Sequence, residues 1–168
     1  DVTFTYNDAN GCESSVVKTF TINPLPALEI RFDGAVGSNS DNTTIAGAAI
    51  CFDEASFDIK GIQEGVGATS GTWTASNGGL TDNGDGTSTF TPSAAATNAG
   101  QSQQGLPSTH DITFTYEDSD GCENSITSTL TVNPQPTLAL EFDGAVAGYS
   151  ASDDIDGTGI CFDETPFI

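Results

Sequence analysis

The chain contains very few positively charged residues. Only 3 of its 168 residues are Lys or Arg, against 24 Asp and Glu, which gives a net charge of −21. Nucleic acids and anionic membranes are bound mainly through Lys and Arg on phosphate groups, so this composition excludes both as ordinary partners. The sequence also lacks a run of about 18 apolar residues, so we expect no membrane insertion in this segment.

Residue types that carry catalysis or bind zinc are scarce as well. His110 is the only histidine, and we expect it to be exposed at the edge of a strand. There is no C-x-x-C pair for zinc and no G-x-S-x-G nucleophile motif. Carboxylates are abundant, but a surface this acidic places many of them close together without any catalytic role. We therefore expect that the protein is not an enzyme.

The sequence is dominated by short segments in which apolar and polar residues alternate. Leu28–Phe32 and Ile112–Tyr116 alternate apolar and polar residues with period two, which predicts strands. The same reading predicts strands at 57–60, 71–74, near Leu80, and at 87–91 and 126–132, with a hairpin turn at 83–86 and no helix. Trp73 is expected in the core. About seven strands without a helix predict an all-β sandwich.

The sequence repeats itself after 110 residues. Residues 1–58 align with residues 111–168 without a gap, and 30 of the 58 aligned positions are identical. The linkers Asn23–Pro26 and Asn133–Pro136 mark the boundaries, because proline lacks a backbone donor and stiffens the chain. We interpret 1–23 as the last hairpin of one repeat, 24–133 as a complete repeat, and 134–168 as the start of the next. The segment is thus expected to belong to a longer tandem array.

Two motifs carry a resemblance to a known group. These are the hairpin TFTYxDxxGC, found at 3–12 and 113–122, and the stretch GLTDNGDGTSTFTPS at 79–93. They resemble the PKD-like and immunoglobulin-like tandem domains of very large secreted proteins of Bacteroidota, among them gliding-motility adhesins. The WDFGDG signature of classical PKD domains is absent, since Thr74 follows Trp73. The resemblance implies tandem immunoglobulin-like sandwiches and an extracellular, cell-surface location.

Each repeat carries two cysteines, which is typical of disulfides in small secreted domains. The four are Cys12, Cys51, Cys122 and Cys161. Cys51 and Cys122 could pair within the complete repeat. Alternatively, Cys51 could pair with the hairpin cysteine of the following repeat. In an immunoglobulin-like sandwich the second strand begins at the end opposite the last hairpin turn, which would separate the first pair. The sequence leaves both pairings open.

Acidic residues recur near the expected domain ends. In the complete repeat they are Asp33, Asp53 and Glu54 on one side and Asp118 and Glu123 on the other. If repeats stack end to end, the two sets approach each other at every joint, where Ca²⁺ could bridge them. The alternative is a solvated acidic surface that keeps a long protein soluble, and no EF-hand loop is present to decide otherwise.

Two functions remain open. The first is a non-catalytic structural repeat of a long extracellular filament or adhesin stalk, whose partners are adjacent repeats and, through lateral self-association, other chains. The alternative is a carbohydrate- or ligand-binding accessory sandwich of a secreted multidomain hydrolase. That alternative needs an exposed aromatic platform, which Trp73 would not supply from the core.

Overall fold

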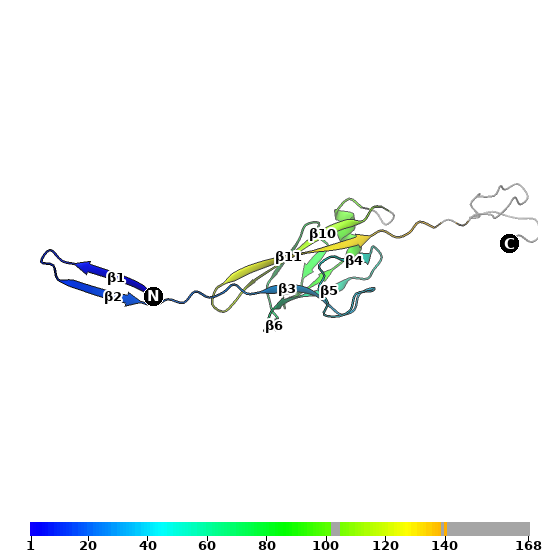
Figure 1. Cartoon of the computed structure of the whole chain (residues 1–168). Helices are drawn as coiled ribbons and strands as arrows, with labels where there is room; N and C mark the ends of the chain where they lie inside the picture. The colour runs from blue at the N-terminus through cyan, green and yellow to red at the C-terminus, as the bar shows by residue number, and fades with distance from the viewer. Residues whose placement is uncertain (102–104, 139, 141–168) are drawn as a thin grey trace, which may run out of the picture.

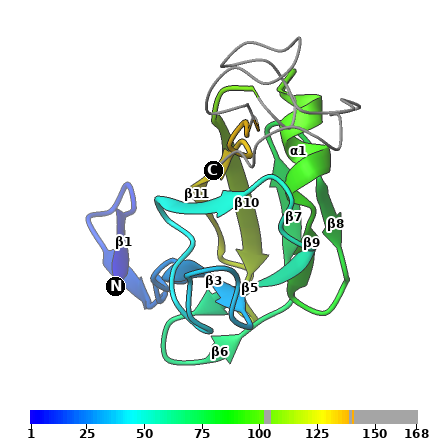
Figure 2. The same ribbon diagram turned by 90° about the vertical axis from the view of Figure 1, so that its right-hand side faces the viewer.

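Two β-sheets enclose one hydrophobic core between residues 28 and 133. The structure, a computed structural model, describes residues 1–101, 105–138 and 140. One sheet has the order β3 (Leu28–Asp33), β5 (Phe57–Gln63), β9 (Thr87–Phe90) and β8 (Leu80–Asp82), with β6 (Gly67–Ala68) also paired to β5. The other has the order β4 (Ala48–Cys51), β11 (Glu123–Asn133), β10 (Ser108–Glu117) and β7 (Thr72–Ala75). The predicted all-β sandwich is confirmed (Figures 1 and 2).

Period-two alternation explains which side chains fill the core. Leu28, Ile30 and Phe32 of β3 are buried, while the residues between them are not. On the opposite sheet, the fully buried Phe114 packs against Trp73 with ring centroids 4.6 Å apart. Trp73 is 8% exposed, so its prediction as a core residue is confirmed.

A glycine makes room for the central aromatic ring. Gly61 of β5 lies directly beneath Phe114, and a Cβ added at Gly61 would overlap the ring. A Cβ added at Gly71, just before β7, would overlap the same ring and the carbonyl oxygen of Thr115. Close packing of this kind fixes how the two sheets face each other, because protein interiors tolerate little extra volume.

All seven predicted strand regions form strands, but the sequence prediction missed three elements. The edge strand β4 pairs in parallel with β11, whereas the other paired strands run antiparallel. β6 has only two residues. The expectation of no helix is wrong: α1 (Pro92–Asn98) begins with proline in its first turn, a position where the missing N–H costs nothing. Its Ala95 and Ala96 are buried, and Ala95 lies against Gly79.

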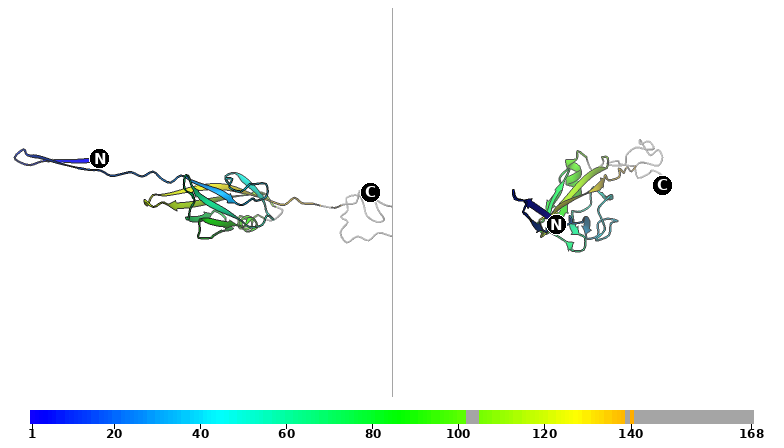
Figure 3. Two further views of the ribbon diagram at one scale, coloured as in Figure 1. Left: turned by 90° about the horizontal axis from the view of Figure 1, so that it is seen from below. Right: turned by 60° about the vertical axis from the view of Figure 1, so that its left-hand side comes forward.

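A separate hairpin precedes the sandwich. It consists of β1 (Val2–Asn7) and β2 (Glu13–Lys18), whose residues are all exposed (Figure 3). Its pairing copies that of β10 and β11 at an offset of 110 residues: Phe4 pairs with Val16 as Phe114 pairs with Ile126. The turns match as well, since the backbone N–H of Asp8 donates to the carbonyl of Cys12 as Asp118 does to Cys122.

The chain enters and leaves the sandwich at opposite ends (Figure 1). We call the end that contains Leu28 and the β10–β11 turn the leading end, and the end that contains Asn133 the trailing end. Among the described residues, no helix is both long and apolar enough to cross a bilayer.

Candidate functional site

The leading end is organised by one aspartate. The Asp118 carboxylate accepts hydrogen bonds from the backbone N–H groups of Asp120 and Cys122, both at 2.9 Å. Gly121 supplies the positive φ of 77° that closes the turn. In the preceding hairpin Asp8 accepts the equivalent bonds, and these backbone donors, led by that of Cys12, lower the pKa of the Asp8 carboxyl. The turn aspartate therefore has a structural role.

The leading end also contacts the incoming linker. The Asn124 side chain donates a hydrogen bond of 2.9 Å to the carbonyl of Pro26. Cys122, two residues earlier, is half-buried. Burial and then the carboxylates of Asp118 and Asp120 raise the pKa of the Cys122 thiol. Glu123 is exposed at the start of β11.

The trailing end contains the other cysteine of the sandwich, Cys51, which is exposed. Cys51 ends β4 and lies opposite Asn133 in the parallel register. The Asn133 carbonyl also accepts a hydrogen bond of 2.8 Å from the backbone N–H of Phe52, which ties the β4 terminus to the outgoing linker. A groove of about 460 Å³ lies between these segments; its lining is Cys51, Asp53, Pro134, Gln135, Pro136 and Leu138.

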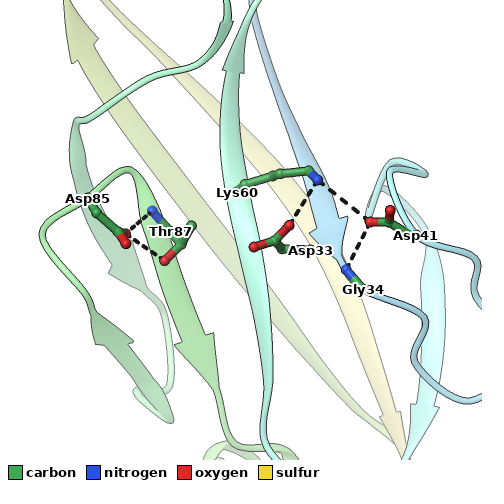
Figure 4. A network of polar contacts seen from close by, with 6 residues as sticks. All are labelled: Asp33, Gly34, Asp41, Lys60, Asp85 and Thr87. Carbon is green, nitrogen blue, oxygen red and sulfur yellow. Dashed lines mark hydrogen bonds and ion pairs between the residues drawn. The ribbon is translucent and has the colours of Figure 1, made fainter.

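Asp33 is compensated by a lysine. The Lys60 ammonium donates a hydrogen bond of 2.9 Å to Asp33 and lies 3.6 Å from Asp41 (Figure 4). The bond to Asp33, opposed by partial burial, raises the pKa of Lys60. The hydrogen bond from the Gly34 N–H is the largest cause that lowers the pKa of Asp41, and Lys60 lowers it further. This network lies on the outer side of β3 and β5, as expected for Lys60 next to the buried Ile59.

The five candidate calcium ligands fall into two sets. Asp33, Asp53 and Glu54 lie at the trailing end, whereas Asp118 and Glu123 lie at the leading end. Within the described part of the chain, no group of three or more Asp, Glu, His or Cys side chains is arranged to hold a metal ion. A site formed by two adjacent repeats would combine the two sets. Four predicted residues fall outside the described part of the chain: Cys161 and the second copies of the trailing acids, Asp143, Asp163 and Glu164.

The expectation that His110 is exposed is wrong. His110 is fully buried and belongs to the same inward-facing row as Ile112 and Phe114, two residues before Ile112 on β10. Its Nε2 lies 2.8 Å from the Ser108 hydroxyl and its Nδ1 lies 3.4 Å from the Asn77 amide. Burial lowers the pKa of His110, which keeps the imidazole neutral. The Ser108–His110 pair thus stabilises a polar position within the core.

Comparison of this chain with family models, with curated proteins and with solved structures gave no match. The features of the molecule that bear on its function are therefore the two ends of the sandwich and the hairpin that precedes it.

Proposed function

We propose that this chain is a structural, non-catalytic module of a long extracellular filament or adhesin stalk. In this proposal immunoglobulin-like or PKD-like sandwiches follow one another end to end, joined by short proline linkers. The acidic composition and the two cysteines per repeat support a secreted, cell-surface location. The observation that carries the proposal is the hairpin β1–β2, whose register and turn copy those of β10–β11.

The hairpin and the segment just after it present apolar side chains that no described residue covers. Val2, Phe4 and Ile22 are 55%, 64% and 83% exposed, whereas their counterparts Ile112, Phe114 and Val132 are buried. Each such side chain gains about 1.5–3 kcal/mol from full burial. Because the counterparts are covered by the opposite sheet of their own sandwich, a preceding sandwich of the same type is the surface that fits this face.

One inward-facing position differs in polarity between the hairpin β1–β2 and the hairpin β10–β11. Ser128, 6% exposed, is replaced by Lys18 in the hairpin. A lysine that points into a sandwich needs a carboxylate or carbonyl partner, since an unpaired buried charge is costly. The preceding repeat is therefore expected to supply an acidic or carbonyl group opposite Lys18.

A hairpin graft tests the proposal. In this protein residues 24–110 are followed by residues 1–23 in place of residues 111–133. Lys18→Ser is added, because the replaced segment has a serine at the equivalent position. We expect a folded sandwich with a cooperative urea transition and the buried emission of Trp73, the only tryptophan. Absence of a cooperative transition in this graft would refute the assignment of the hairpin.

Matched variants of the graft distinguish the two faces of the hairpin. Phe4→Ala removes an inward ring and should cost about 3–5 kcal/mol. Thr5→Ala changes the neighbouring outward residue and should stay within about 0.5 kcal/mol. Equal costs would mean that the hairpin does not enter the sandwich in the register of β10–β11.

The ligand-binding alternative receives no support from the exposed aromatics. Phe4 and Tyr6 are exposed in the hairpin, and Phe20 is exposed just after it. Their counterparts are Phe114, Tyr116 and Leu130, of which Phe114 and Leu130 are fully buried and Tyr116 packs against the core. These rings therefore match core positions rather than a carbohydrate platform. Asp33 and Asp118 already accept hydrogen bonds from protein groups, so the proposed module does not depend on calcium at these two residues.

A further inference from the structure

The two cysteines of the complete repeat lie at opposite ends of one strand. Cys122 immediately precedes β11, and Cys51 lies opposite Asn133, the last residue of β11. The strand has 11 residues, which at about 3.4 Å per residue corresponds to roughly 35 Å. A disulfide requires Cα atoms within about 7 Å. Cys51 and Cys122 of the same sandwich therefore cannot pair while it is folded.

Each cysteine instead lies beside a linker. Cys51 is exposed and lines the trailing-end groove together with Pro134 and Pro136. Cys122 lies two residues before Asn124, whose side chain holds the Pro26 carbonyl of the incoming linker. The repeat places Pro136 at the position equivalent to Pro26. The outgoing linker of one sandwich thus leads directly to the hairpin turn of the next.

The linker is short enough to bring these two positions together. Asn133, which lies opposite Cys51, and Pro136, which corresponds to the contact of Asn124, are three residues apart. Three Cα–Cα steps span at most about 11 Å, and a bent linker spans less. A sandwich that abuts the trailing end therefore carries its turn cysteine to the mouth of the groove in which Cys51 is exposed.

We propose that Cys51 of each repeat forms a disulfide with the β10–β11 turn cysteine of the following repeat, so that every joint of the array is covalently closed. This inference rests on the proposed function. The two thiols lose two protons and two electrons as the S–S bond forms. A disulfide oxidant, such as oxidised glutathione or the disulfide form of an oxidoreductase, accepts the electrons through a mixed disulfide and leaves as two thiols.

The staple would counteract a repulsion that the same geometry creates. Asp53 lines the trailing-end groove, and the equivalents of Asp118 and Asp120 would arrive with the next turn. Like charges this close repel each other unless they are screened or held together. A disulfide fixes the two ends against that repulsion and makes the joint resistant to bending and to tension.

A two-copy protein, residues 24–133 followed by residues 24–133, contains one complete joint. Each copy is expected to fold independently, because every residue of the buried hydrophobic core lies between Leu28 and Val132. The protein is exposed to oxidised glutathione and its cysteines are mapped by non-reducing peptide analysis. We expect one disulfide, between Cys51 of the first copy and Cys122 of the second, with the other two thiols remaining reactive.

Two serine variants provide the matched control. Cys51→Ser in the first copy should abolish the disulfide, whereas Cys51→Ser in the second copy should leave it intact. A single copy should keep both thiols free. A bond within one copy, bonds only between molecules, or four free thiols in folded protein would overturn the staple.

The two proposals fail in different ways. If both copies show buried Trp73 emission and cooperative unfolding but all thiols stay free, the staple is wrong and the array of sandwiches stands. If the two copies do not fold as two sandwiches, both the staple and the proposed function are wrong.

Discussion

The contact between Gly61 and Phe114 gives a stability prediction with an unusual sign. Gly61 has ordinary strand geometry, so replacing it with alanine would normally stabilise a strand by about 0.5–1 kcal/mol. Here the added Cβ would overlap the ring of Phe114, which is fully buried and packed on Trp73. Overpacking of a filled core costs about 1–3 kcal/mol. We expect Gly61→Ala to destabilise the sandwich by about 1–2 kcal/mol.

A double-mutant cycle isolates the contact. Urea unfolding of the 168-residue chain, followed by Trp73 fluorescence, gives the free energy of unfolding for Gly61→Ala, Phe114→Leu and the double variant. The smaller leucine should relieve the overlap, so the cost of Gly61→Ala should shrink in the Phe114→Leu background. Gly65→Ala is the control, because Gly65 has a φ of 79° and open space around it, so its cost should not change. A neutral Gly61→Ala, or a cost that Phe114→Leu leaves unchanged, would refute the packing argument.

The charged groups give three more predictions. Because burial lowers the pKa of His110, the imidazole binds a proton more readily in the unfolded chain than in the folded one. Stability measured by urea unfolding should therefore fall as the pH drops below the ordinary histidine value of about 6.5, and His110→Gln should flatten this dependence. Lys60→Met should cost about 0.2–1 kcal/mol near neutral pH, and the cost should vanish as the pH rises past the raised pKa of Lys60; an unchanged cost at high pH would contradict the ion pair. EDTA should leave the melting temperature of two joined copies of residues 24–133 unchanged, since Asp33 and Asp118 have protein partners; a lower melting temperature would restore calcium as a ligand at the joint.

The sequence could predict the strands because each has one face in the core. Alternation identified Leu28–Phe32 and Ile112–Tyr116, and the expected position of Trp73 was correct. The same alternation, extended by two residues, would have placed His110 inward. Its place at the edge of the predicted strand led to the wrong expectation, and the hydrogen bond to Ser108 gives the buried imidazole a polar partner. Helix α1 was missed because seven residues are too few to show a helical period, although Thr91-Pro92 followed by alanines was an available signal.

The candidate joint was harder to predict. The sequence left the pairing of Cys51 and Cys122 open, because the full lengths of β4 and β11 could not be read from short alternating runs. The parallel register that places Cys51 opposite Asn133 is a tertiary feature, and β4 showed no strand pattern of its own. Partners that belong to another repeat cannot be located from one sandwich alone.

The central claim is that the sandwiches extend end to end. Small-angle X-ray scattering of proteins with one, two and three copies of residues 24–133 tests it most directly. The 11-residue β11 and a short linker predict that the maximum dimension grows by roughly 40–50 Å with each added copy. Growth of less than about 20 Å per copy would contradict the account. Such small growth is expected for sandwiches that fold back side by side, with a diameter near that of a compact domain.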